Sequence, residues 1–242
     1  MEQLPKSLEE AIAEAMVATQ AALEDGYTRL QVELVFPELR MMPIAQQFLS
    51  AFEDRGSRLR VFFPDAGAAA LARRDWGDKD YAIRGMGELK AKMQPDEELF
   101  IFIEPSSVEV GQLEELCTEA GDRPVVLLNP RLEDIATIGI GYAGRQLRER
   151  FLSQFDSCYY LQPTDGAAIS RSYPASWRVW LEREEGEYEL IAEEPRKPVG
   201  EALNQLLLQA IGGGESEAAQ PSTMKRPGLL SGLQQFLRAL SQ

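Results

Sequence analysis

The sequence contains no histidine, which excludes several kinds of active site. Among its 242 residues there is no imidazole to act as a general base, to complete a Ser-His-Asp or Cys-His system, or to join the common zinc and haem ligand sets. The two cysteines, Cys117 and Cys158, lie far apart without C-x-x-C spacing. We therefore favour buried free thiols in a reducing compartment over a disulfide or redox pair, and we expect no metal site.

Positive charge is scarce, with 25 Lys and Arg against 39 Asp and Glu and a formal net charge of −14. Such a chain is repelled by phosphate backbones and anionic bilayers, so nucleic acid is excluded as a general partner. No apolar run approaches the roughly 20 residues that span a bilayer, and the start MEQLPKSLEE resembles neither a signal nor a transit segment. We expect a cytoplasmic chain.

Helical and strand patterns alternate along the first 211 residues, which we interpret as one domain with one sizeable core. The strands are predicted at Leu30–Phe36, Leu59–Phe63, Tyr81–Arg84, Leu99–Ile103, Val125–Leu128, Cys158–Leu161, Trp177–Glu182 and Tyr188–Ala192. Several of them are apolar throughout, as strands buried on both faces are. The predicted class is α/β, with a mostly parallel sheet, helices on both faces and a C-terminal β-hairpin at the edge.

Five predicted strands end in an X-Pro step followed by a polar residue: LVFPE, VFFPD, FIEPS, LLNPR and YLQPT. Proline ends a strand and holds the preceding residue extended. The carboxyl edge of a parallel sheet, where open α/β sheets bind ligands, would then carry a crevice. Its predicted residues are Glu38, Arg40, Asp65, Glu104, Ser106, Asn129, Arg131, Thr164 and Asp165. The alternative is that these polar groups only cap the following helices, as Asp65, Ser106 and Thr164 could.

Gly139, Gly141 and Gly144 spell G-x-G-x-x-G, the pattern of a dinucleotide-binding turn. They follow a position where a loop is expected, so we favour a turn before a helix over a cofactor site, and we expect no cofactor. The next residues include Arg145, Arg148 and Arg150. This local basic face either docks an acidic partner or pairs with neighbouring acids.

The C-terminal residues differ from the rest of the chain. Residues 212–223, GGGESEAAQPST from Gly212, have the composition of a flexible linker, and residues 224–242 contain three basic residues and no acid. Apolar residues recur there at helical spacing: Leu229, Leu230, Leu233, Phe236, Leu237 and Leu240. This predicts a tethered amphipathic helix that folds back on its own domain, binds a partner or lies on a membrane surface.

Four sequence blocks carry a family resemblance: LPKSLEEAIAEAMVATQAALEDGYTRLQVELVFPEL, VFFPDAGAAALARRDW, VVLLNPRLED and SRSYPASWRVW. They resemble a cyanobacterial and plastid family catalogued as a domain of unknown function, which includes the plant low photosystem II accumulation factor three. The resemblance covers about Leu4 to Ile211 and brings no catalytic residues with it. It implies a photosynthetic organism, a place at the thylakoid surface, and a role in photosystem assembly or maintenance with a photosystem subunit or assembly factor as partner.

These observations leave two candidate functions. The expected one is a non-catalytic auxiliary or assembly protein, peripheral at the thylakoid, that binds partners through Arg145, Arg148, Arg150, Leu230, Leu233, Phe236, Leu237 and Leu240. The alternative is a nucleotide- or small-molecule-binding enzyme that uses the crevice. A related domain fused to an adenylate kinase keeps the nucleotide-linked role open.

Overall fold

The fold is built on a nine-stranded sheet with the strand order β3-β2-β4-β5-β1-β6-β7-β8-β9. A computed structural model describes residues 3–88, 91–132, 146, 148–184 and 186–212. The first six strands in this order are parallel, and the last three continue the sheet as an antiparallel extension. The strands are β1 (Arg29–Leu34), β2 (Leu59–Phe63), β3 (Ala82–Gly85), β4 (Leu99–Ile103), β5 (Val125–Leu128), β6 (Asp156–Thr164), β7 (Ala167–Ser172), β8 (Trp177–Glu184) and β9 (Glu187–Glu194).

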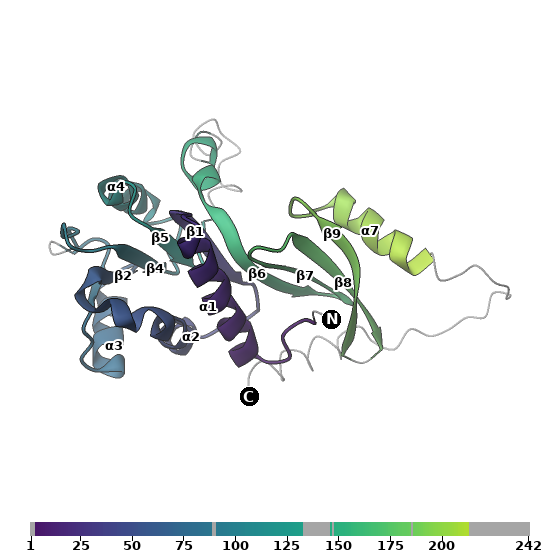
Figure 1. Ribbon diagram of the computed structural model, residues 1–242, viewed down its shortest axis with the longest axis horizontal. Helices are drawn as coiled ribbons and strands as arrows, with labels where there is room; N and C mark the ends of the chain where they lie inside the picture. Colours follow the sequence, from purple (N-terminus) through teal and green to yellow (C-terminus); the bar gives the residue numbers. More distant parts are fainter. Residues whose placement is uncertain (1–2, 89–90, 133–145, 147, 185, 213–242) are drawn as a thin grey trace, which may run out of the picture.

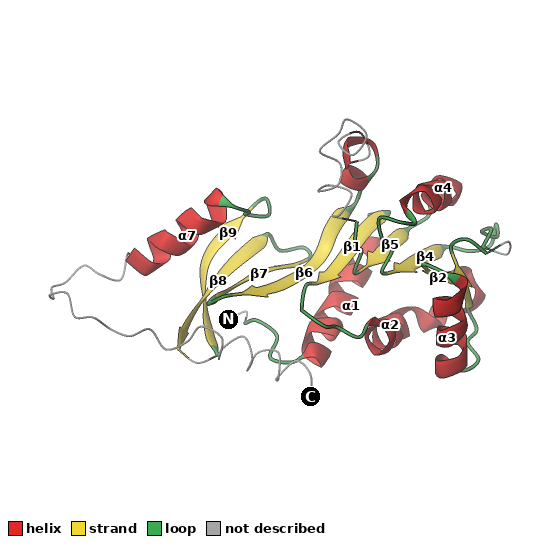
Figure 2. Cartoon of the chain, turned by 180° about the vertical axis from the view of Figure 1, so that it is seen from behind, coloured by secondary structure: helices red, strands yellow, loops and turns green. Residues whose placement is uncertain are grey.

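Helices lie on both faces of this sheet (Figures 1 and 2). The first three helices lie together on one face, and α4 and α7 lie on the other. Their bounds are α1 (Leu8–Glu24), α2 (Met41–Leu49), α3 (Ala66–Trp76), α4 (Val110–Ala120) and α7 (Glu201–Gly212), with 3-10 turns η1 (Ser50–Arg58) and η2 (Leu152–Gln154). The predicted α/β class, the mostly parallel sheet and the hairpin at its edge are confirmed.

The apolar strands explain why the core has two layers. Strands β2, β4 and β5 are buried at every position, because they have neighbours on both sides and helices above and below. One core cluster packs Leu30, Val32 and Leu34 against α1 and α2, and the other packs Phe100 and Phe102 against α4. Strand β1 is the exception among the central strands, because its apolar residues face only the α1 side.

Local signals at the helix ends act as the sequence predicts. The Ser7 hydroxyl accepts a hydrogen bond from the Glu10 backbone at 3.1 Å and caps α1, and Gly26 follows the helix with a positive φ of 88°. Asp65 caps α3 by accepting from the backbone N–H groups of Gly67 and Ala68. For Asp65 the helix-capping alternative is therefore confirmed.

Two predictions about the strands were wrong. Strand β7 was not predicted at all, because its sequence, AAISRS, has little of the β-branched and aromatic character that marks a strand. Strand β6 was expected to stop at Pro163 but runs on to Thr164, with Pro163 opposite Ala168. The lost N–H is tolerated there because Pro163 lies next to the tight turn into β7.

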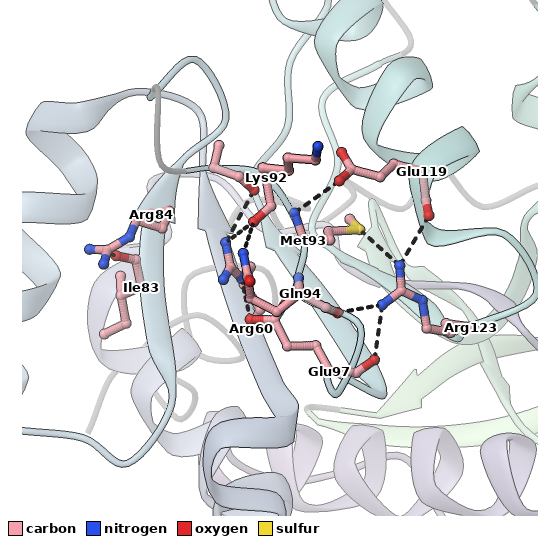
Figure 3. Close-up of polar contacts among 10 residues, drawn as sticks. Arg60, Ile83, Arg84, Lys92, Met93, Gln94, Glu97, Glu119 and Arg123 are labelled. Carbon is pink, nitrogen blue, oxygen red and sulfur yellow. Dashed lines mark hydrogen bonds and ion pairs between the residues drawn. The ribbon is translucent and has the colours of Figure 1, made fainter.

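Among the described residues the connection from β3 to β4 contains no helix, and it is held by the buried Arg60 and the half-buried Arg123 (Figure 3). Arg60 of β2 is 5% exposed; it donates to Glu97 Oε1 at 2.6 Å and to the carbonyl of Lys92 at 2.8 Å. Arg123 donates to the carbonyls of Gln94 and Glu97 while its guanidinium lies 4.7 Å from the centre of the Phe100 ring. These contacts lie at the amino edge of β4, so they stabilise the fold on the side away from the carboxyl edge.

The two cysteines are free and buried, as predicted. Cys158 belongs to the core cluster on the α1 side and Cys117 to the cluster on the α4 side. The sheet separates them, so they do not form a disulfide. Burial raises the pKa of the Cys117 thiol to about 12 and that of Cys158 to about 11.

Candidate ligand cleft at the carboxyl edge of the sheet

An open cleft of about 830 Å³ lies at the carboxyl ends of β1, β5 and β6. The chain leaves β1 towards α2 on one face of the sheet and leaves β4, on the far side of β5, towards α4 on the other face. Strands whose carboxyl ends lead to connections on opposite faces leave a crevice between them, and ligands of open α/β sheets bind in such crevices. The volume lies within the range of about 300–1,000 Å³ that is usual for small-molecule sites.

The floor of the cleft is the side of the sheet that faces away from α1. Glu33 and Gln162 supply polar groups, and Tyr160 and Ile169 supply the buried apolar part. The remaining lining comes from the loop after β1, the end of β5 and the segment that leads into α7: Leu34, Val35, Phe36, Glu38, Leu39, Asn129, Pro130, Arg131, Thr164, Lys197, Pro198, Val199, Gly200 and Leu203.

Arg131 forms one wall of the cleft and is held in place by Glu104 and Pro105. Its Nη2 donates to Glu104 Oε1, and its backbone N–H donates to the carbonyl of Pro105 at 2.8 Å. Burial raises the pKa of the Glu104 carboxyl above its usual value, and the neighbouring Arg131 guanidinium opposes this rise. The Arg131 side chain is 64% exposed, so its guanidinium remains accessible from solvent.

Three residues other than glycine have positive φ angles in the described chain, and all three follow strands at this edge. They are Glu38 at 60°, Glu104 at 46° and Asn129 at 52°. Non-glycine residues rarely adopt this conformation, and such residues cluster at functional sites. At Asn129 it is stabilised because the side-chain Oδ1 accepts from the backbone N–H of Leu34 at 2.8 Å, which ties β5 to β1.

This backbone corrects the prediction for two of the X-Pro steps. Glu104 and Asn129 precede Pro105 and Pro130 and were expected to be extended, but both are left-handed. The steric effect of the proline disfavours only the right-handed helical region strongly. Hydrogen bonds from the backbone N–H groups of Glu104 and Asn129 to the Leu128 and Val32 carbonyls hold the left-handed turns.

Lys197 forms the opposite wall. Its ammonium lies 3.9 Å from the centre of the Tyr160 ring and 5.8 Å from that of Trp177, a geometry that attracts a cation to the aromatic faces. In the described part of the chain no carboxylate forms an ion pair with this ammonium, although acids greatly outnumber bases. The Tyr160 hydroxyl in turn donates to Gln162 Oε1.

The structure brings part of the predicted crevice together. Glu38, Asn129 and Arg131 line the cleft, and Glu104 contacts it through Arg131. Four of the other predicted residues do not line the cleft. Asp65 caps α3, Arg40 is exposed before α2, Asp165 is exposed in the turn after β6, and Ser106 accepts from the backbone N–H of Val108. Thr164 lines the cleft and also donates to the carbonyl of Ala167.

Of the predicted arginine face, Arg148 is exposed and Arg150 forms an ion pair with Glu114 at 2.9 Å. For Arg150 the structure therefore shows the pairing alternative. The other residues named as candidates lie outside the described residues: Gly139, Gly141, Gly144, Arg145, Leu230, Leu233, Phe236, Leu237 and Leu240.

Sequence reasoning missed the apolar lining of the cleft and four of its polar side chains: Glu33, Tyr160, Gln162 and Lys197. The sequence did contain a signal for Glu33. The sequence of β1, RLQVEL, alternates between polar and apolar residues, whereas the central strands β4 and β5 are apolar throughout. Polar residues on one face of a strand in the middle of a sheet need polar partners, water or a ligand on that face.

The arrangement can bind and orient a ligand. Its lining combines two cations, two carboxylates and two amides with an apolar floor. In the described residues no group of three or more Cys, Asp or Glu side chains is placed to hold a metal ion, and no helix is both long and apolar enough to span a membrane.

The chain belongs to the family described as a domain of unknown function, DUF1995, whose family model matches residues 5–205. This stretch includes every named strand of the sheet and all the residues that line the cleft. No solved structure shows a significant match to the chain.

Proposed function

We propose that this DUF1995 member is a non-catalytic auxiliary protein of the photosynthetic apparatus, acting in photosystem II assembly or maintenance at the thylakoid surface. Its partner is a photosystem subunit or another assembly factor. The sequence blocks around α1, α3, β5 and β8 that resemble the cyanobacterial and plastid proteins support the photosynthetic setting.

The structural observation that carries the proposal is the uncovered apolar face of α7. No residue of this helix is fully buried, although it contains three consecutive leucines, Leu206 to Leu208. Leu208 is 67% exposed and Ile211, less than one turn further, is 57% exposed. The helix is nevertheless anchored, because Arg183 of β8 donates to the carbonyl of Ala210 at 3.5 Å.

The predicted amphipathic segment lies close to this face along the chain. Residues 213–228, of mostly linker composition, separate α7 from Leu229, the first apolar residue of that segment. An uncovered helix face and a tethered apolar segment together offer more area for a protein partner than either alone. Peripheral contact with the membrane surface through the segment would add to the attachment.

The test is co-sedimentation of the full chain with isolated thylakoid membranes. We expect the double variant Leu208→Asp/Ile211→Asp to remain in the supernatant. Burial of each of these side chains contributes roughly 1.5–3 kcal/mol to the binding free energy before ordering costs, and the substitutions remove this contribution. Val17→Asp on α1 is the matched control, since Val17 is 66% exposed but lies on a different helix. Leu233→Asp/Leu237→Asp tests the C-terminal segment in the same assay.

Melting temperatures separate attachment from folding. A variant that leaves the pellet while its melting temperature stays within about 2 °C of the parent supports the proposal. If the α7 variant sediments like Val17→Asp, the α7 face does not bind the partner and the proposal loses its structural support.

A further inference from the structure

We propose that the cleft binds a phosphorylated, hydroxyl-bearing metabolite of nucleotide size. This inference goes beyond partner binding, because the α7 face could recruit a partner with the cleft empty. It concerns binding and orientation only, and no reaction is assigned to the site.

The two cations indicate the charge of the ligand. Arg131 comes from the end of β5 and Lys197 from the segment before α7, so they approach the cleft from different walls. The Lys197 ammonium is held over aromatic rings and not by a carboxylate of the described chain, so its N–H groups remain able to donate to a ligand. Two donors of this kind suit the several oxygens of a phosphate better than a single carboxylate.

The acidic side of the cleft indicates what else the ligand carries. Glu33 and Glu38 lie on and after β1, and Gln31 fixes Glu33 by donating to its Oε2 at 2.9 Å. Carboxylates at this edge of an open α/β sheet accept hydrogen bonds from ribose or other sugar hydroxyls. The same carboxylates disfavour a ligand that is only an anion, because they would repel it.

The apolar floor and the volume set the size. Tyr160 and Ile169 are 2% and 3% exposed and form a cluster to which Leu203 of α7 adds. A ligand on this floor would also contact Val199 and Gly200, directly before α7. Binding is therefore expected to restrain the first turn of α7 and to slow amide hydrogen exchange there.

The experiment is isothermal titration of the full chain with ADP, NADP⁺ and fructose 1,6-bisphosphate. Inorganic phosphate and adenosine serve as probes of the two parts of the ligand. We expect at least one phosphorylated organic probe to bind with a dissociation constant below about 1 mM, and more tightly than phosphate or adenosine. Amide exchange in residues 201–207 should slow with that probe and not with adenosine.

Matched variants test the site itself. Lys197→Met keeps the apolar stem and should weaken binding about tenfold or more, whereas Lys6→Met, an exposed lysine before α1, should not change it. Arg131→Gln should behave like Lys197→Met, with exposed Arg74→Gln as its control. The proposal is wrong if none of the three probes binds below about 1 mM, if phosphate or adenosine alone binds as tightly, or if Lys197→Met binds like the parent.

Discussion

The substitution Glu97→Gln tests how the β3–β4 connection is held. The side chains of Arg60 and Glu97 are 6% and 4% exposed, and their closest atoms are 2.6 Å apart. An amide at position 97 removes the negative charge that Glu97 holds against the Arg60 guanidinium. The amide NH₂ group also replaces one of the two carboxylate oxygens. Oε1 accepts from Arg60, and Oε2 accepts from the Gln94 backbone N–H at 2.7 Å, so either replacement sets two hydrogen-bond donors against each other. Removing one partner of a buried pair costs about 3–5 kcal/mol.

The adjacent residue provides the control. Glu98 pairs with Arg58 at 3.0 Å, but its side chain is 49% exposed, so Glu98→Gln should cost no more than about 1 kcal/mol. Urea unfolding followed by the fluorescence of the three tryptophans measures both free energies of unfolding. If the two variants differ by less than about 1 kcal/mol, the buried pair does not stabilise the connection as argued.

Three further predictions concern other parts of the chain. Gly85→Ala should lower the free energy of unfolding in urea by about 1–3 kcal/mol, because a Cβ there would lie 2.6 Å from the Ala66 backbone nitrogen. A Cβ at the control position Gly111 meets nothing within 4 Å, so Gly111→Ala should be neutral or stabilising, and equal losses in the two variants would contradict this. The thiols of Cys117 and Cys158 should react with a thiol reagent at neutral pH only after denaturant is added, because burial raises their pKa values to about 12 and 11. Labelling of the folded chain would contradict this, since it would show that the thiols are accessible. Arg131→Gln should raise the pKa of Glu104 further, as followed by NMR titration. Since a raised carboxyl pKa gives stability that is lost as pH rises through it, the variant should lose more stability than the parent between acidic and neutral pH, and a parallel pH profile would refute this.

Most of the sheet could be predicted because its strands carry local signals. LFIFI and VVLL are continuous apolar runs and LRVFF is apolar except at Arg60, and the predicted bounds of β2, β4 and β5 agree with the observed ones. The short strand β7 lacks such a signal, since it is stabilised by pairing with β6 and β8 and by the burial of Ala167 and Ala168. A local window of sequence does not show which distant segments pair with each other.

The cleft could be predicted only in part for the same reason. The X-Pro steps placed Glu38, Asn129 and Arg131 at the carboxyl edge, because parallel strands end together. Lys197 could not be found in this way, since it reaches the cleft only after the antiparallel extension has turned the chain back towards β6. The left-handed turns at Glu104 and Asn129 likewise depend on hydrogen bonds to neighbouring strands, which a local window of sequence does not show.

The most direct test of the proposed function is an affinity pull-down from a lysate of thylakoid membranes, with the tagged full chain as bait. The account predicts that photosystem II subunits or their assembly factors are recovered with the parent and with Val17→Asp. It predicts that they are lost with Leu208→Asp/Ile211→Asp and reduced when residues 224–242 are removed. Recovery of no photosystem component, or equal recovery with all four baits, would contradict it.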